Sequence, residues 1–406
     1  IGTRVRVSID AGKTFTYNPV INCCQAGNTI HIDNHAYWIN PHDPKHLIFG
    51  NDGGLAISRD RGETFRFVRN LPLAQFYHIA VDNDLPYNVY GGLQDNGSWR
   101  GPSEVWENGG IRNLHWQEVG FGEGFDTLPD PDNSRSGYGM SQGGNLYRWN
   151  LDSGEQKVVM PDPPTADIEL RFNWNAALAI DPFDPNTIYY GSQFVHRSHD
   201  RGQSWSTISP DLTSNDPKMQ TYKTSGGLTT DVTAAENYTS IVAIAPSKLQ
   251  RDVVWVGSDD GRVHITRDGG GSWTRIDGKA RGVSPGAWVP MISPSPHEVD
   301  TAFVVFDDHR RSDMKPYIYR VEDHGNRWTR LSTDGMRGYA LSVLQDPVDP
   351  DLLFAGTEFG LHVSIDGGDS WSKFTAGLPT VSVMDMAIQE RENDLVLGTH
   401  GRAAYV

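Results

Sequence analysis

Short apolar runs, many of them alternating with polar residues, follow one another along the chain and are separated by turns rich in Gly, Pro, Asp and Asn. Between His35 and Val68 four such runs occur in succession, reading HAYWINP, HLIFGND, GLAISRD and TFRFV. Apolar runs of this length bounded by turn residues predict β-strands rather than helices. The pattern therefore predicts a unit of four strands, and the same order recurs in residues 175–208 and 339–374.

Each of these three units has a proline-containing segment between its first and second strands, reading PHDPKH, DPFDPN and DPVDPD. Proline has no N–H to donate to a strand ladder, and it favours a turn. These segments therefore mark the first hairpin of each unit.

An octet with the pattern S/T-x-D-x-G-x-S/T-aromatic lies between the third and fourth strands of these units. Five copies and one worn copy begin at Ser8, Ser58, Ser198, Thr266, Ser364 and, for the worn copy, Val321. The Asp can accept hydrogen bonds from backbone N–H groups of its own turn, and the Gly supplies unusual backbone angles. The aromatic ring can fill the space between neighbouring sheets. We interpret the octets as structural staples without a catalytic role.

A repeat of roughly 40–50 residues built from strands is typical of a β-propeller, in which each repeat is one four-stranded blade. First strands are expected near residues 35, 76, 124, 175, 239, 288 and 339. The expected fold is all-β, a single β-propeller over residues 1–406 with seven or eight blades. Residues 1–19 and 381–406 are expected to be partial blades. The two ends can join into an eighth blade. However, both read as third strands, which is one too many for a single blade, so the alternative is that they belong to a neighbouring propeller.

Composition and charge narrow the function classes. With 43 Gly and 24 Pro, turns are frequent and long helices are not expected. The net charge of −16 argues against a nucleic-acid partner, because a phosphate backbone needs a basic surface. No apolar run approaches the roughly 18 residues that span a bilayer, so we expect no membrane span.

The opening IGTRVRVSIDAGKTF reads as mid-strand, which indicates a mature product or part of a longer protein. Cys23 and Cys24 are adjacent, and form either a vicinal disulfide or two thiols.

The octets resemble the Asp-box, or BNR, repeat of sialidases, family 74 xyloglucanases and sortilin-type receptors. Longer strings, HIDNHAYWINPHDPKHLIFGNDGG, PYNVYGGLQDNGSWRGP, LLFAGTEFGLHVSIDGGDSW and LVLGTHGRAAYV, are similar to large bacterial BNR-repeat glycosyl hydrolase or sortilin-N-terminal-like proteins. The resemblance covers nearly the whole chain, and it implies a second propeller in a longer protein. Family 74 enzymes place one catalytic Asp on each of two propellers, and neither Asp matches a position here. The sialidase arginine triad and tyrosine nucleophile are not identifiable either.

The segment HIDNH carries a candidate metal site. In an extended strand His31, Asp33 and His35 would share one face, and two imidazoles with one carboxylate can hold Zn²⁺ or Ca²⁺ and a reactive water. Three ligands from one strand would crowd the ion, so another blade would have to contribute. The alternative interpretation is a set of hydrogen-bonded polar groups at the channel rim.

Acidic and amide residues follow the second strands of several units. Gln94, Asp95 and Asn96 lie in GGLQDNGSW, and Asp52, Asp259 and Glu358 occupy the equivalent place in other units. They either line one face of the ring and bind a ligand or cap their own hairpins.

The loop GFGEGF places Glu123 among glycines, with Asp126 entering the next first strand. Together with Asp95, these carboxyl groups are candidates for general acid or base. The segment RFNWN offers Asn173 and Asn175 to a ligand's hydroxyl groups. THGR adds His400 and Arg402, where Arg can pair with a carboxylate or form an internal salt bridge.

These residues lead to three hypotheses. The first is a secreted, extracellular or periplasmic, carbohydrate-active protein that binds a polysaccharide at the channel mouth and hydrolyses it. The second is a sortilin-like module that binds a peptide without reaction. The third is a metal-dependent hydrolase centred on HIDNH.

Overall fold

The computed structural model describes residues 5–18, 30–220 and 237–406, so the adjacent cysteines at 23 and 24 lie outside the described residues. The protein is all-β, with 43% of it in strands. Its described residues form nine antiparallel sheets, of which seven have four strands, one has three and one has two. None of the helices in these ranges is long and apolar enough to cross a membrane.

The strands of the first half are bounded as follows. The two-stranded sheet contains β1 (Arg6–Val7) and β2 (Thr16–Tyr17). The next four sheets contain β3 (Asn34–Ile39), β4 (Leu47–Asn51), β5 (Gly54–Ser58) and β6 (Arg66–Phe67); β7 (Phe76–Val81), β8 (Asn88–Leu93), β9 (Ser98–Pro102) and β10 (Gln117–Gly120); β11 (Thr127–Asp130), β12 (Asn133–Ser141), β13 (Asn145–Asn150) and β14 (Gln156–Val158); and β15 (Leu178–Asp181), β16 (Asp184–Gly191), β17 (Val195–Ser198) and β18 (Ser206–Thr207).

The second half continues in the same way. Its sheets contain β19 (Ile241–Pro246), β20 (Val254–Ser258), β21 (Val263–Thr266) and β22 (Thr274–Arg275); β23 (Trp288–Pro294), β24 (Ala302–Asp308), β25 (Asp313–Glu322) and β26 (Arg327–Arg330); β27 (Ala340–Gln345), β28 (Leu353–Thr357), β29 (Gly360–Ser364) and β30 (Ser372–Lys373); and β31 (Val383–Gln389), β32 (Asp394–Thr399) and β33 (Ala404–Tyr405). Short 3-10 helices are η2 (Asn113–His115), η3 (Pro217–Met219), η4 (Asp277–Lys279), η5 (His309–Arg311) and η6 (Asp323–Gly325).

Every four-stranded sheet pairs its strands in sequence order, as expected for blade-like units. The expected first strands fall within three residues of β3, β7, β11, β15, β19, β23 and β27. Strands β1 and β2 pair with each other, while β31–β33 form a sheet of their own. In the described ranges no strand pairing joins these two end pieces.

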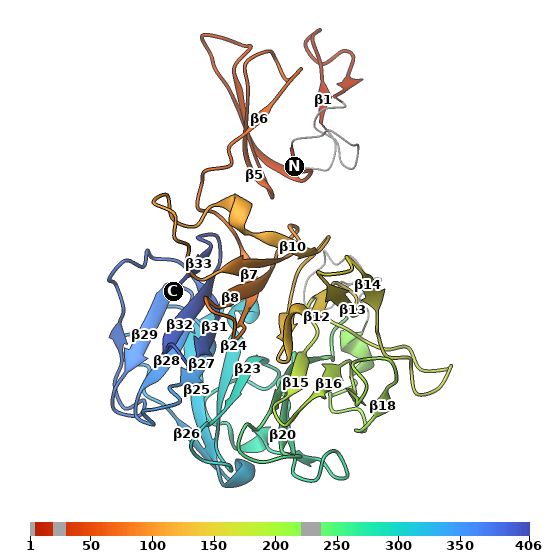
Figure 1. Cartoon of the computed structure of the whole chain (residues 1–406), viewed down its shortest axis with the longest axis vertical. Helices are drawn as coiled ribbons and strands as arrows, with labels where there is room; N and C mark the ends of the chain where they lie inside the picture. Colours follow the sequence, from red (N-terminus) through yellow and green to blue (C-terminus); the bar gives the residue numbers. More distant parts are fainter. Residues whose placement is uncertain (1–4, 19–29, 221–236) are drawn as a thin grey trace.

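The sheet β31–β33 packs beside the sheet β7–β10. Asp385 on β31 accepts the backbone N–H of Ile79 on β7 at 3.0 Å, and Tyr87 donates to Asp394 at 2.8 Å. In Figure 1 the sheets from β7 to β33 are grouped together, and the sheet β3–β6 stands apart from them with β1 nearby. Strand β3 is correspondingly open to solvent along most of its length, with Tyr37, Trp38 and Ile39 exposed.

The octet turns have the hydrogen bonds that the sequence predicts. In the turn at 364–371, Asp366 Oδ1 accepts the N–H of Ser370 at 2.9 Å. Ser364 Oγ donates to Asp366 at 2.7 Å and accepts the N–H of Gly368 at 2.8 Å. The four other intact copies repeat this network around Asp10, Asp60, Asp200 and Asp268. The worn copy has Val321 in place of the hydroxyl residue, and its turn is the short helix η6 instead.

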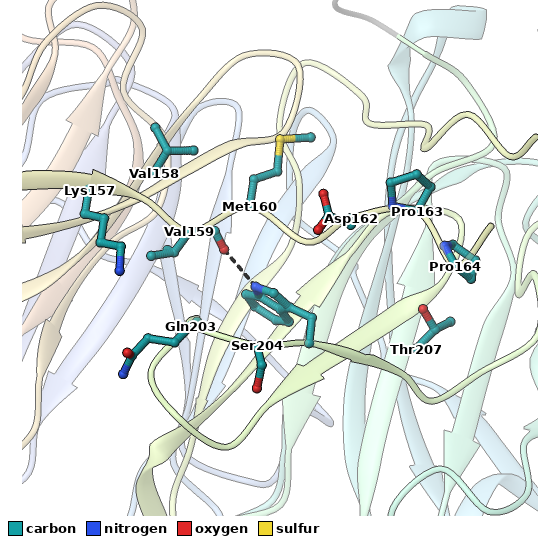
Figure 2. Close-up of a pocket in the computed structure, with 12 residues that line it drawn as sticks. Lys157, Val158, Val159, Met160, Asp162, Pro163, Pro164, Gln203, Ser204 and Thr207 are labelled. Atoms are coloured by element: carbon teal, nitrogen blue, oxygen red, sulfur yellow. Dashed lines mark hydrogen bonds between the residues drawn. The ribbon is translucent and has the colours of Figure 1, made fainter. Parts of the chain in front are cut away.

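The glycine and the aromatic residue of the octet have the expected roles too. Gly368 has φ +95, a left-handed conformation that glycine adopts without steric cost. The indole N–H of Trp205 donates to the carbonyl of Val159 in the preceding sheet at 2.8 Å, the bond drawn as a dashed line in Figure 2. Trp273 makes the same bond to Ile208 at 2.8 Å. Each of these rings therefore fastens its turn to the neighbouring sheet.

The octet carboxylates should make stability depend on acid. Asp366 has a pKa lowered to about 2, chiefly by the hydroxyl and N–H of Ser370. A lowered folded-state pKa means that the stabilisation is complete above the unfolded pKa and is lost as the pH falls through 2. Asp366→Asn should therefore lower the melting temperature at pH 6, and the difference from the wild type should vanish near pH 2 in scanning calorimetry.

Asp369→Asn is the matched control, since this residue of the same turn is exposed and makes no side-chain hydrogen bond in the described structure. An equal loss of stability in both variants would contradict the staple interpretation.

Candidate functional site

Three cavities meet near residues 400–402, where β32 leads into β33. The junction cavity, about 460 Å³, lies between the sheets β3–β6 and β7–β10 and includes Asp52 and Asp95. The central cavity, about 450 Å³, is lined from all seven sheets between β7 and β33, by their first strands or the residues just before them. The rim cavity, about 490 Å³, contains Glu358, His400 and Arg402.

The junction and central cavities adjoin at two glutamines. Gln75 and Gln94 line both cavities, and the amide of Gln75 donates to the side-chain oxygen of Gln94. His400 lines both the central and the rim cavity, and its backbone bridges to Gln75. The adjoining cavities thus bring together predicted residues that are distant in the sequence, Asp52, Gln94 and His400.

A row of three carboxyl groups connects the junction cavity to the interior. Asp52 lies in the turn after β4, Asp95 in the turn after β8, and Glu123 in the loop after β10. The carboxyl group of Asp95 lies beside those of both Asp52 and Glu123, and it raises the pKa of each. Asp95 has φ +57, and its backbone N–H donates to Glu123 Oε2 at 3.2 Å. The Asp95 turn is therefore fixed from both sides.

The surroundings of Glu123 and Asp52 favour the protonated form of these two carboxyl groups. Glu123 is only 5% exposed, and burial together with the neighbouring Asp95 carboxyl group raises its pKa to about 8. Burial also raises the pKa of Asp52, and Asp95 adds to the rise. His35 Nε2 lies 2.6 Å from Asp52 Oδ1, and this contact partly offsets the rise in the pKa of Asp52. Neighbouring carboxyl groups that cannot all ionise share protons, as in acid dyads.

In the central cavity two carboxyl groups lie beside one buried histidine, and there the charged form of the histidine is favoured. Burial disfavours a charged imidazole at His78, but Asp126 at 3.8 Å and Asp385 at 3.3 Å outweigh it and raise the pKa to about 9. Burial raises the pKa of Asp126 to about 6, even though His78 opposes the rise. At neutral pH Asp126 is therefore a carboxylate beside an imidazolium. Asn175 contacts the other ring nitrogen of His78.

The other predicted residues lie in the junction cavity, in the central cavity or inside the fold. Asn96 lines the junction cavity, and its amide donates to the carbonyl of Asp52 at 2.9 Å. Asn173 lines the central cavity and donates to Asp259 at 2.7 Å. Asp259 is 1% exposed and also accepts the N–H of Ser240 at 2.9 Å, so it joins segments inside the fold. Of the four acidic turn residues, Asp259 is thus buried in the fold, whereas Asp52 and Asp95 line the junction cavity and Glu358 lines the rim cavity.

The expectation that His31, Asp33 and His35 alternate along one strand face is wrong. Strand β3 begins only at Asn34, and Asp33 has a left-handed φ of +56. His31 contacts the carbonyl of Asp95 at 3.0 Å, whereas His35 contacts Asp52. The left-handed residue breaks the period of two, so the metal hypothesis loses the geometry on which it was based. In the described residues, the one group of three close potential ligands is Asp300, Asp323 and His324, outside the three cavities.

The sequence analysis did not identify two ionisable residues of first strands that line the central cavity, His78 and Asp385. His78 lies in FYHIAV and Asp385 in VMDMAIQ, both ionisable side chains within apolar first strands. An ionisable residue inside an apolar strand could have identified them, because such a group in a largely buried strand needs a charged or polar partner. Their pairing was not readable, since His78 and Asp385 are 307 positions apart in the chain.

The raised pKa of Glu123 gives a prediction for stability. The unfolded carboxyl loses its proton near its ordinary value of 4.5, while the folded one keeps it until about pH 8. Stability therefore falls as the pH rises through this range. Glu123→Gln should remove this loss, so between pH 5 and 8.5 the melting temperature of the wild type should fall by roughly 2 °C or more relative to the variant.

The exposed Glu104 provides the control, and Glu104→Gln should leave the pH dependence unchanged. Parallel melting curves for wild type and Glu123→Gln across this pH range would show that Glu123 is ionised in the folded protein.

Comparisons with known proteins leave the family open. No protein-family model matches the chain, and no curated protein is similar to it at a significant level. The resemblance to Asp-box proteins therefore rests on the octets and the longer strings of the sequence.

Proposed function

We propose that the chain is a β-propeller in which the seven sheets between β7 and β33 surround the central cavity, and that it hydrolyses glycosidic bonds where that cavity meets the junction cavity. The observation that carries the proposal is the difference in proton affinity between two adjoining carboxyl centres. The Glu123 carboxyl has a pKa of about 8 and that of Asp126 a pKa of about 6. A proton-rich and a proton-poor carboxyl centre are what acid–base hydrolysis of a glycoside uses.

The roles follow from accessibility. Asp95 lines the junction cavity, so it is the group that would protonate the glycosidic oxygen, while buried Glu123 and neighbouring Asp52 supply and share the proton. Asp126 lines the central cavity and would act as the base toward water, with its charge maintained by His78.

Asp52 and Asp95 cannot be the acid and base of one reaction. Their carboxyl groups are direct neighbours that affect each other's proton affinity, whereas glycosidases separate the two by about 5 Å or more. The second carboxyl therefore comes from beyond Gln75 and Gln94, which lie in the walls of both cavities.

The resemblance of the longer strings to bacterial BNR-repeat proteins supports an extracellular or periplasmic location and a polysaccharide substrate. The longer protein that the resemblance implies would place a second propeller beside the sheet β3–β6.

The test is the release of reducing ends from a panel of neutral and acidic polysaccharides. Asp95→Asn and Asp126→Asn should each lower kcat/KM about 10²- to 10⁴-fold, the range expected for loss of a general acid or base. Asparagine tolerates the left-handed backbone at position 95, so the fold is retained. The pH profile of kcat/KM should be bell-shaped, with limbs near 6 and 8. Wild-type rates in Asp95→Asn would refute the proposed mechanism.

A second candidate function is ligand binding without turnover. It is favoured by the aromatic and amide lining of the central cavity, which includes Trp174 and Trp288 beside Asn173 and Asn175. Tight binding of a peptide in this cavity, with no product released from any polysaccharide, would establish this alternative.

A further inference from the structure

A group of aromatic and charged residues lines the central cavity on the side of β23, β24 and β27, away from His78 on β7. It consists of Trp288 on β23, Asp307 on β24, His309 and Arg310 in η5, and Tyr339 just before β27. None of these residues has a part in the acid–base mechanism proposed above.

Arg310 is held rigidly by two partners. Its guanidinium carbon lies 3.7 Å from the ring centroid of Trp288, and one terminal N–H group donates to Asp307 at 3.2 Å. Asp307 is 3% exposed and also accepts the backbone N–H of His309 at 3.0 Å. An arginine positioned in this way loses little conformational entropy when it binds a ligand.

The rest of the guanidinium is free to bind. In the described residues Nε and the second terminal nitrogen of Arg310 have no hydrogen-bond partner, and the side chain is 39% exposed. His309 stacks on Tyr339 with ring centroids 4.2 Å apart and directs Nδ1 to Asp307 at 2.7 Å. Its Nε2 has no partner in the same part of the chain. The planar fork of an arginine matches the two oxygens of a carboxylate.

We propose that Arg310, supported by Trp288 and His309, binds a carboxylate group of the ligand in the central cavity. This inference deepens the proposed function and rests on it for the ligand class: a polysaccharide that contains uronic acid residues. The amides of Gln75 and Gln94 in the same cavity suit the hydroxyl groups of such a sugar. In a chain of net charge −16, a fixed cation also selects where an acidic ligand can dock.

The test is calorimetric titration with tetragalacturonate and with its methyl ester, which has the same ring but no charge. The wild type should bind the acid at least tenfold more tightly than the ester. Arg310→Gln should remove this preference, with little change in the affinity for the ester. Arg310→Lys should retain part of the preference, because it keeps the charge and loses the bidentate geometry.

The matched control is Arg251→Gln. Arg251 lies over the ring of Phe183 at 5.1 Å, a similar cation–aromatic contact outside the three cavities, and its loss should leave both affinities unchanged. Equal binding of acid and ester by the wild type, or an unchanged preference in Arg310→Gln, would overturn the inference. Binding of an acidic peptide that is tighter than that of the sugar and equally sensitive to Arg310→Gln would overturn the assignment to a uronate.

Titration needs no turnover, so its result is separate from that of the hydrolysis assay. If the acid-selective binding occurs and no polysaccharide is cleaved, the hydrolase proposal fails while the carboxylate site remains. If cleavage depends on Asp95 but acid and ester bind alike, the reverse conclusion holds.

Discussion

The fold depends on a carboxylate in a tight turn that binds the backbone of that turn. In each intact octet one Asp accepts an N–H and a hydroxyl four residues later, so that the chain reverses between the third and fourth strands. The ring that follows then reaches the preceding sheet, as Trp205 does at Val159. A local hydrogen-bond network thereby fixes a contact between sheets.

The carboxyl groups of the octet turns differ in proton affinity from those buried near the cavities. The octet Asp residues make hydrogen bonds that favour their charged form, and the pKa of Asp200 falls to about 2. Glu123 and Asp126 lie near the inner ends of the sheets, where burial favours the neutral form and raises the pKa. The same side-chain chemistry is therefore inert at the outer turns and available for proton transfer inside. Net charge alone, at −16, does not reveal this division.

Much of the fold could be predicted from the sequence, because the information was local. Turn octets, proline segments and short apolar runs each specify structure within a few residues, so β3–β6 and the other four-stranded sheets were expected near their positions. The candidate site was predicted in part, since Asp52, Asp95 and Glu123 were singled out from their turns, yet nothing in the chain showed that they touch. HIDNH misled because a single left-handed residue, Asp33, ends the alternation on which the metal hypothesis relied. His78, Asp385 and Arg310 escaped notice because their roles come from contacts between distant strands.

The carboxyl row spans two separately built sheets. Asp52 belongs to the sheet β3–β6, whereas Asp95 belongs to the sheet β7–β10, and residues 68–75 join the two. The pKa of Asp52 therefore depends on the position of the sheet β3–β6 relative to the sheet β7–β10. A displacement of β3–β6 that moves Asp52 away from Asp95 would change the pKa of Asp52 without altering any residue of the junction. Substitutions in the connecting segment can therefore change the proton affinity of the row while every carboxyl group is kept.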